Sequence, residues 1–160
     1  MPILLTDGQI RTLLEEPKRL KPGFRKSLRP RAKPGHAEAD VQVTGDAGSV
    51  FWVRVRQSAA NPIDFSVILS YEVPGSNRSF NLRRYNGKAH DHANKLEGDR
   101  FYDFHVHLAT ERYQAEGERE ERYAEPTTRF ATVDEALECL LRECGFVDPE
   151  PATDQLPLDL

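Results

Sequence analysis

Two His-x-His pairs are the residues of this chain best suited to chemistry. The first pair is His90 and His92, and the second is His105 and His107. Imidazole titrates near neutral pH, can donate or accept a proton, and binds metal ions when it is neutral. We therefore predict a catalytic site formed by these four histidines together with the neighbouring acids Asp91 and Asp103.

Three interpretations of these histidines are open at this level. In the first, which needs no cofactor, one imidazole takes the proton of an RNA 2′-hydroxyl and another protonates the leaving oxygen, while Arg54, Arg56 or Lys88 stabilises the phosphorane charge. In the second, imidazoles and a carboxylate bind zinc or another divalent ion. In the third, these are only surface or hydrogen-bonding histidines.

The second pair lies in a predicted strand, and the strand period decides which way it points. Side chains alternate between the two faces of a strand. Phe104 and Val106 therefore share the apolar face of segment 100–109, and His105 and His107 share the other. We expect both imidazoles on a solvent-accessible face, opposite Phe104 and Val106.

Two further predicted strands alternate in the same way and extend the polar face. In one of them Phe51, Val53 and Val55 oppose Trp52, Arg54 and Arg56; in the other Phe80 and Leu82 oppose Asn81, Arg83 and Tyr85. If these polar faces coincide, they form a cationic, partly aromatic sheet surface. Arg54, Arg56 and Lys88 are accordingly predicted to contact nucleic acid.

The fold class predicted from these patterns is α+β. Helical periodicity spans 4–20 and 132–144, and strand-like segments span 40–44, 50–57, 64–73, 78–85 and 100–109. Short connections between neighbouring strands favour antiparallel pairing. We expect a single domain over residues 1–146, with an antiparallel sheet of about five strands flanked by an N-terminal and a C-terminal helix.

The segment 17–37 is rich in lysine and arginine, and residues 17–34 contain no acid. Such a stretch can neutralise phosphates and release their counterions. We predict a basic arm in which Arg25, Lys26, Arg29 and Arg31 bind nucleic acid, RNA rather than DNA. The alternative is a solvated connector that has no ligand.

Other features bear on location. No run of about 18 apolar residues is present, and the first residues lack the pattern of a secretion signal. The two cysteines, Cys139 and Cys144, lack the spacing of a thiolate metal site and are expected to be reduced. The chain is therefore expected to be cytoplasmic and to have no membrane partner.

Two segments of the chain carry a resemblance to a known family. They are Tyr85-Asn-Gly-Lys-Ala-His-Asp-His92 and, just before the predicted C-terminal helix, Arg129-Phe-Ala-Thr-Val-Asp-Glu-Ala-Leu137. This pattern resembles the TumE-type toxins of toxin–antitoxin pairs. The resemblance covers roughly residues 50–146, and Asn86, His90 and His92 are the matching positions. It implies an endoribonuclease-like toxin with an antitoxin partner. The chain departs from the pattern by its second histidine pair and its basic segment.

The last residues suggest a function of a different class. Segment 147–160 reads as a flexible tail, and its final residues Gln155, Leu158 and Leu160 resemble the peptides that dock on the bacterial sliding clamp. A tail that only covers its own domain is the other interpretation of these residues.

The leading prediction rests on the histidines and is a prokaryotic nucleic-acid-directed protein, in the form of a metal-independent endoribonuclease-like toxin. The alternative function is that of a non-enzymatic replication, repair or mobile-element accessory protein that binds the clamp through the tail.

Overall fold

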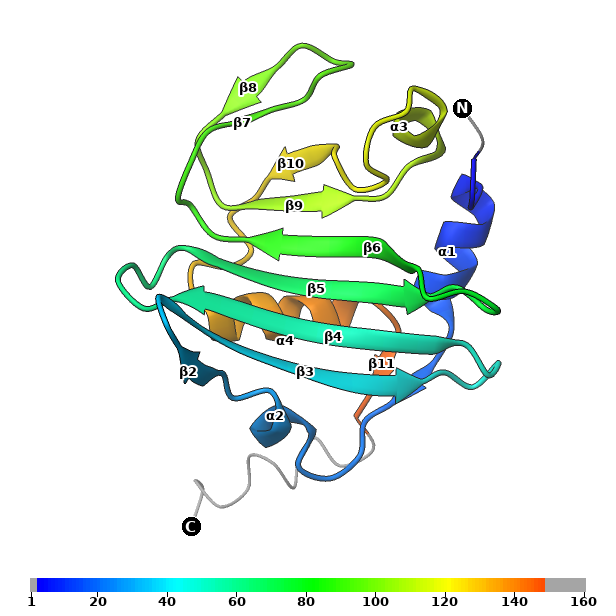
Figure 1. Cartoon of the computed structure of the whole chain (residues 1–160), viewed down its shortest axis with the longest axis horizontal. Helices are drawn as coiled ribbons and strands as arrows, with labels where there is room; N and C mark the ends of the chain where they lie inside the picture. The colour runs from blue at the N-terminus through cyan, green and yellow to red at the C-terminus, as the bar shows by residue number, and fades with distance from the viewer. Residues whose placement is uncertain (1–2, 149–160) are drawn as a thin grey trace.

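The computed structural model describes residues 3–148 and is built around one large sheet. Seven strands form it, all antiparallel to their neighbours, in the order β10-β9-β6-β5-β4-β3-β2 (Figure 1). Their bounds are Arg31–Lys33 for β2, His36–Thr44 for β3, Val50–Ser58 for β4, Phe65–Glu72 for β5, Ser79–Asn86 for β6, His105–Leu108 for β9 and Ala124–Pro126 for β10.

The predicted α+β class is confirmed, whereas the predicted five strands are too few. The two strands that were missed, β2 and β10, form the edges of the sheet and contain three residues each. Three residues are too few to show a period of two, so the sequence pattern gives no signal for them.

The longest described helix, α4 (Val133–Glu143), lies behind the sheet in the view of Figure 1. Thr132 caps its N-terminus by accepting a hydrogen bond from the Glu135 amide at 3.1 Å, and Gly145, with φ of 79°, follows its end. Its buried face, which includes Leu140, packs with the apolar side chains of β4, β5 and β6 into one core. The predicted C-terminal helix is therefore present.

The N-terminal helix α1 (Asp7–Glu15) is shorter than the predicted segment 4–20. Thr6 and Gln9 form a capping box at its start, and Pro17 prevents its continuation. Two shorter helices, α2 (Phe24–Ser27) and α3 (Glu111–Ala115), complete the described helices. No helix among residues 3–148 is long and apolar enough to cross a bilayer.

Two small pairs of strands lie outside the large sheet. β1 (Lys18–Arg19) pairs in parallel with β11 (Phe146–Val147), and β7 (His92–Ala93) pairs with β8 (Arg100–Phe101) as a hairpin. The single strand predicted over 100–109 is therefore two strands, β8 and β9, separated by three residues. This break lets the β7–β8 hairpin leave the large sheet (Figure 1).

The basic segment 17–37 is a folded part of the domain rather than an arm. It contains β1, α2 and β2, and its side chains Phe24 and Leu28 are buried in the core. The sequence predicted a basic arm or a connector, but these apolar side chains, spaced at i and i+4, hold the segment against the domain.

Lys18 is completely buried, and its ammonium group joins the ends of two helices. Nζ donates hydrogen bonds to the carbonyl oxygens of Leu13 at 2.8 Å, Leu14 at 3.2 Å and Glu16 at 2.9 Å, at the end of α1. It also donates to the carbonyl of Cys144 at 2.7 Å, at the end of α4. Helix C-termini favour a cation, while burial lowers the pKa of Lys18 to about 8.

A β-bulge in β6 determines which of its side chains face the core. Ser70 of β5 pairs with Asn81, but the adjacent Leu69 pairs with Arg83, so one residue of β6 has no partner. Arg83 and Tyr85 therefore point to the core side, and the prediction that placed them on the polar face is wrong. The bulge turns Arg84 to the polar face instead.

Several predictions concern the tail. β11 extends to Val147, one residue into the segment predicted to be flexible. Gln155, Leu158 and Leu160 lie outside the described residues. The clamp-binding peptide therefore stays a prediction.

Candidate metal centre

Three imidazoles converge on the face of the sheet opposite to α4. They belong to His105 and His107 of β9 and to His92 of β7, and one ring nitrogen of each lies within 4.8 Å of those of the other two. The ring centroids are 5.5 Å apart for His92 and His105, 4.9 Å for His92 and His107, and 5.0 Å for His105 and His107. We call these three residues the histidine cluster.

Strand alternation positions two members of the cluster, as predicted. Val106 is buried in the core beside its strand partner Tyr85, and the imidazoles on either side of it point the opposite way. The predicted exposure, however, is wrong: His105 is 0% exposed, and His92 and His107 are 8% exposed. The β7–β8 hairpin covers them, and the Phe101 ring lies 5.6 Å from that of His105.

Backbone carbonyl groups fix the tautomers of the two β9 histidines. Nδ1 of His105 lies 2.8 Å from the carbonyl oxygen of Asp103, and Nδ1 of His107 lies 2.8 Å from that of Glu121. A carbonyl oxygen can only accept, so both Nδ1 atoms carry the proton. The lone pair of each neutral ring is consequently on Nε2, and Nε2 of His105 lies 3.5 Å from Nδ2 of Asn86, which can donate to it.

Asn94 fixes the third imidazole in the opposite tautomer. Its amide forms a reciprocal pair with the backbone of Ala124: Oδ1 accepts from the Ala124 amide at 2.9 Å and Nδ2 donates to the Ala124 carbonyl at 2.8 Å. Oδ1 also lies 2.9 Å from Nε2 of His92, so Nε2 is the donor and Nδ1 carries the lone pair. No pattern in the sequence indicates this role for Asn94.

Burial keeps the cluster uncharged. Desolvation lowers the pKa of His105 to about 4 and lowers the pKa of His107 still further, and it also lowers the pKa of His92. The positive charge of Arg84 adds to the effect on His105 and His107. At neutral pH three neutral imidazoles therefore face one another, the protonation state that metal ions bind.

We expect the metal-free protein to lose stability as pH falls from 6.5 to 5. In that window an unfolded chain protonates His105, whose ordinary pKa is about 6.5, while the folded chain holds that pKa at about 4. The unfolded state then binds more protons, so the free energy of unfolding falls with falling pH. Carboxylates remain largely ionised above pH 5, so urea denaturation with a chelator present isolates the imidazoles.

A control variant makes that test specific. His105→Gln removes the titrating ring, and its stability should change less between pH 6.5 and 5 than that of the unmodified chain. An unmodified chain whose unfolding midpoint in urea stays constant over this range contradicts the expectation.

An ion pair lies beside the cluster. Arg84 is the strand partner of His107, and its guanidinium group donates to the carboxylate of Glu121, which is 2% exposed and also accepts from Nδ2 of Asn81 at 2.8 Å. The backbone of Glu121 holds His107 as well. Arg84 is thus a fixed cation next to the imidazoles, and its Nε has no hydrogen-bond partner among the described residues.

The other predicted catalytic residues border the cluster without joining it. The exposed His90 places its ring 6.2 Å from that of His105. Asp91 is exposed and lies 3.6 Å from Arg100. Asp103 contributes its backbone carbonyl, but its carboxylate is exposed and is no member of the group of converging ligands.

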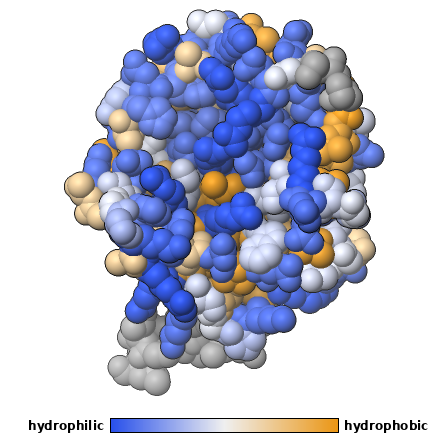
Figure 2. All heavy atoms as spheres, in the orientation of Figure 1, coloured by the Kyte–Doolittle hydropathy of each residue, from blue (hydrophilic) through white to orange (hydrophobic). Residues whose placement is uncertain are grey.

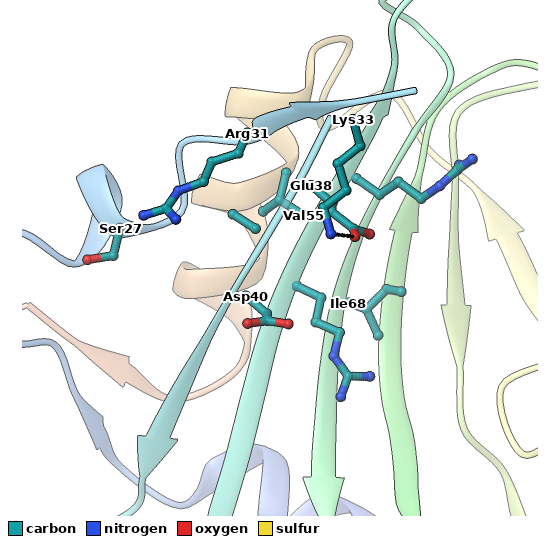
Figure 3. A pocket seen from close by; sticks show the side chains of 10 residues that line it. Ser27, Arg31, Lys33, Glu38, Asp40, Val55 and Ile68 are labelled. Atoms are coloured by element: carbon teal, nitrogen blue, oxygen red, sulfur yellow. Dashed lines mark ion pairs between the residues drawn. The ribbon is translucent and has the colours of Figure 1, made fainter. Parts of the chain in front are cut away.

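The residues predicted to bind nucleic acid do not all lie together. Arg31, Arg54 and Arg56 line an open groove on the face opposite to α4, with a volume of about 610 Å³ (Figure 3). Arg25 instead forms ion pairs with Glu138 at 2.7 Å and with Asp148, so its charge is balanced within the fold.

The remaining cations of the prediction lie elsewhere. Lys26 and Arg29 are exposed in α2 and in the residues that follow it. Lys88 is half-buried, and its Nζ lies 5.8 Å from the ring centroid of Tyr102.

Comparisons with known proteins add no relative. No protein-family model matches the chain, and no curated protein or solved structure matches it. The histidine cluster must therefore be interpreted from its own geometry, and the resemblance to TumE-type toxins stays a prediction.

Proposed function

We propose that this protein binds one divalent transition-metal ion, zinc in the first instance, through His92, His105 and His107. The observation that carries the proposal is the convergence of three buried imidazoles, each of which has one ring N–H group held by a hydrogen bond. In metal sites the ligating histidine commonly donates its second ring nitrogen to a carbonyl or carboxylate, which orients the ring. Here every member has such a partner.

The donor set favours zinc over calcium or magnesium. Imidazole nitrogen suits zinc, copper, nickel and iron, whereas calcium and magnesium prefer oxygen. Nitrogens bound to one zinc at about 2.0–2.1 Å in a tetrahedron lie roughly 3.4 Å apart. The ring nitrogens of the cluster lie within 4.8 Å of each other, so small ring rotations close the site.

Three protein ligands leave one tetrahedral position for water or substrate, the arrangement typical of catalytic rather than structural zinc. A metal in such a site makes its bound water more acidic and polarises a substrate oxygen. Arg84, fixed by Glu121, is placed to stabilise negative charge nearby. We therefore propose metal-assisted hydrolysis as the reaction class.

This proposal replaces metal-free acid–base catalysis as the leading interpretation. General acid catalysis needs an imidazole that is protonated near the working pH. The pKa of His105 is lowered to about 4, so its ring is neutral near pH 7.

Metal content tests the proposal. The full chain should be purified without an affinity tag and without chelator, then analysed by plasma mass spectrometry. We expect close to one zinc per chain, and we expect chelated protein to take up one equivalent in a calorimetric titration. The variant His36→Ala removes a histidine on β3, outside the cluster, and should leave the stoichiometry unchanged.

Cobalt provides a second measurement. Co²⁺ bound by three imidazoles and water in a four-coordinate site should give visible absorption, and zinc should displace it. Absence of metal after purification, together with no uptake of Zn²⁺ or Co²⁺ by the folded apo-protein, contradicts the proposal.

A nucleic-acid-directed protein is the second candidate, and the groove lined by Arg31, Arg54 and Arg56 favours it. In this case the metal centre is the reactive group and the groove is the binding surface. An antitoxin partner and sliding-clamp binding remain proposals that depend on partner assays. Co-purification with the host clamp before and after removal of residues 149–160 tests the second of them.

A further inference from the structure

Two rows of side chains connect the basic groove to the histidine cluster across the sheet. In one row, strand pairing places Arg54, Ile68, Arg84 and His107 side by side on β4, β5, β6 and β9. In the other row it places Arg56, Ser66, Asn86 and His105 side by side. We call these eight residues the cross-strand strip.

The strip lies on the face of the sheet turned away from α4. Figure 2 shows that hydrophilic residues cover most of this face, with a small hydrophobic area near its middle. Adjacent strands are about 4.8 Å apart, so the strip spans roughly 14 Å from the arginines of β4 to the imidazoles of β9. That is long enough for a chain of several linked groups and too long for one small anion.

The charges of the strip are not all used within the fold. Among the described residues, Arg54 and Arg56 form no ion pair within 4 Å, although Asp40 and Glu38 are their strand partners on β3. Glu38 is occupied by Lys33 at 2.8 Å (Figure 3). The two arginines therefore remain available to an anionic ligand.

Aromatic groups accompany these cations. The guanidinium of Arg54 lies 5.9 Å from the ring centroid of Trp52, on the same face of β4. At the other end, Tyr102 is 48% exposed and Lys88 lies over its ring. Surfaces that bind single-stranded nucleic acids combine cations with aromatic rings. Unpaired bases stack on the rings, and the phosphates contact the cations.

We infer that the cross-strand strip binds a single-stranded nucleic acid, with Arg54 and Arg56 on its phosphates and a phosphodiester directed toward the β7–β8 hairpin, which covers the histidine cluster. Arg84, the strand partner of His107, is the cation of the strip nearest to the histidine cluster, and Glu121 holds its guanidinium group in place. The assignment of a substrate rests on the proposed metal centre; the binding itself does not need the metal.

Binding is therefore measured on the metal-free full chain, separately from zinc uptake. Fluorescence anisotropy is recorded with 12-nucleotide RNA, single-stranded DNA and duplex DNA in low salt with chelator. We expect the single strands to bind more tightly than the duplex. For Arg54→Ala combined with Arg56→Ala, we expect affinity to fall at least about tenfold, and loss of two phosphate contacts should reduce the salt slope by about 1.4.

A matched variant controls for net charge. Arg11→Ala combined with Arg142→Ala removes two exposed arginines from α1 and α4 and should leave the affinity unchanged. Arg54→Lys combined with Arg56→Lys should retain most of the binding, and melting temperatures show whether each variant folds. A preference for RNA or for DNA within the single strands identifies the sugar and supports the inference in either case.

Three results overturn the inference: no binding of any single strand in low salt, equal losses in the β4 and control variants, or equally tight binding of the duplex. Failure of zinc uptake with intact, Arg54- and Arg56-dependent binding removes the metal centre and supports the strip. Zinc uptake without nucleic-acid binding supports the metal centre and removes the strip as a binding surface.

Discussion

His107→Ala should reduce zinc affinity by more than about a hundredfold, because it removes a ligand and leaves two imidazoles that cannot complete the site. Calorimetric titration of the chelated variant measures the change. Without metal, the melting temperature of the variant should stay within a few degrees of that of the unmodified apo-protein. Added zinc should raise the melting temperature of the unmodified protein alone, because a ligand that binds the folded state stabilises it.

Asn94→Ala tests the tautomer argument separately. This change leaves all three ligands in place but removes the acceptor of His92 Nε2–H and the reciprocal pair with Ala124. Zinc affinity should fall by about 10–100-fold, the usual effect of losing an orienting partner. His90→Ala, which changes the exposed neighbour, should bind zinc normally. If His107→Ala binds zinc as tightly as the unmodified chain, the cluster is not the metal site.

Lys18→Met should lower the free energy of unfolding by roughly 3–5 kcal/mol, because buried carbonyl oxygens left without a donor each cost about 1–3 kcal/mol. Methionine fills a similar volume, so the change leaves the carbonyl oxygens of Leu13, Leu14, Glu16 and Cys144 without their ammonium donor. Urea denaturation followed by circular dichroism measures the loss.

A second lysine gives the matched control for that prediction. Lys26 is exposed on α2, and Lys26→Met should change stability by no more than about 0.5 kcal/mol. Comparable losses in the two variants contradict the structural role assigned to Lys18.

The sequence correctly predicted features that follow from local periodicity. Alternation around Val106 placed His105 and His107 on one face, and the apolar stripe ending at Gly145 identified α4. It could not predict that the imidazoles are buried, because their cover comes from a hairpin whose position depends on the contact between Asn94 and Ala124, 30 residues away.

Other errors have equally specific causes. Arg84 was missed because a single bulge in β6, opposite Leu69 and Ser70 of β5, reverses the alternation of its side chains. Lys18 was counted with a basic arm because its carbonyl acceptors come from two helices at opposite ends of the chain. Glu121, in an acidic stretch of the sequence, gave no sign that its carboxylate would be buried against Arg84.

The parallel pairing of β1 with β11 has a consequence for how the protein is made. Lys18 leaves the ribosome early, yet one of its acceptors, the carbonyl of Cys144, is synthesised 126 residues later. Domains start to form while translation continues, at about 5–20 residues per second. The nascent chain therefore keeps this lysine hydrated for several seconds, and the N-terminal segment can lock into place only after α4 has emerged.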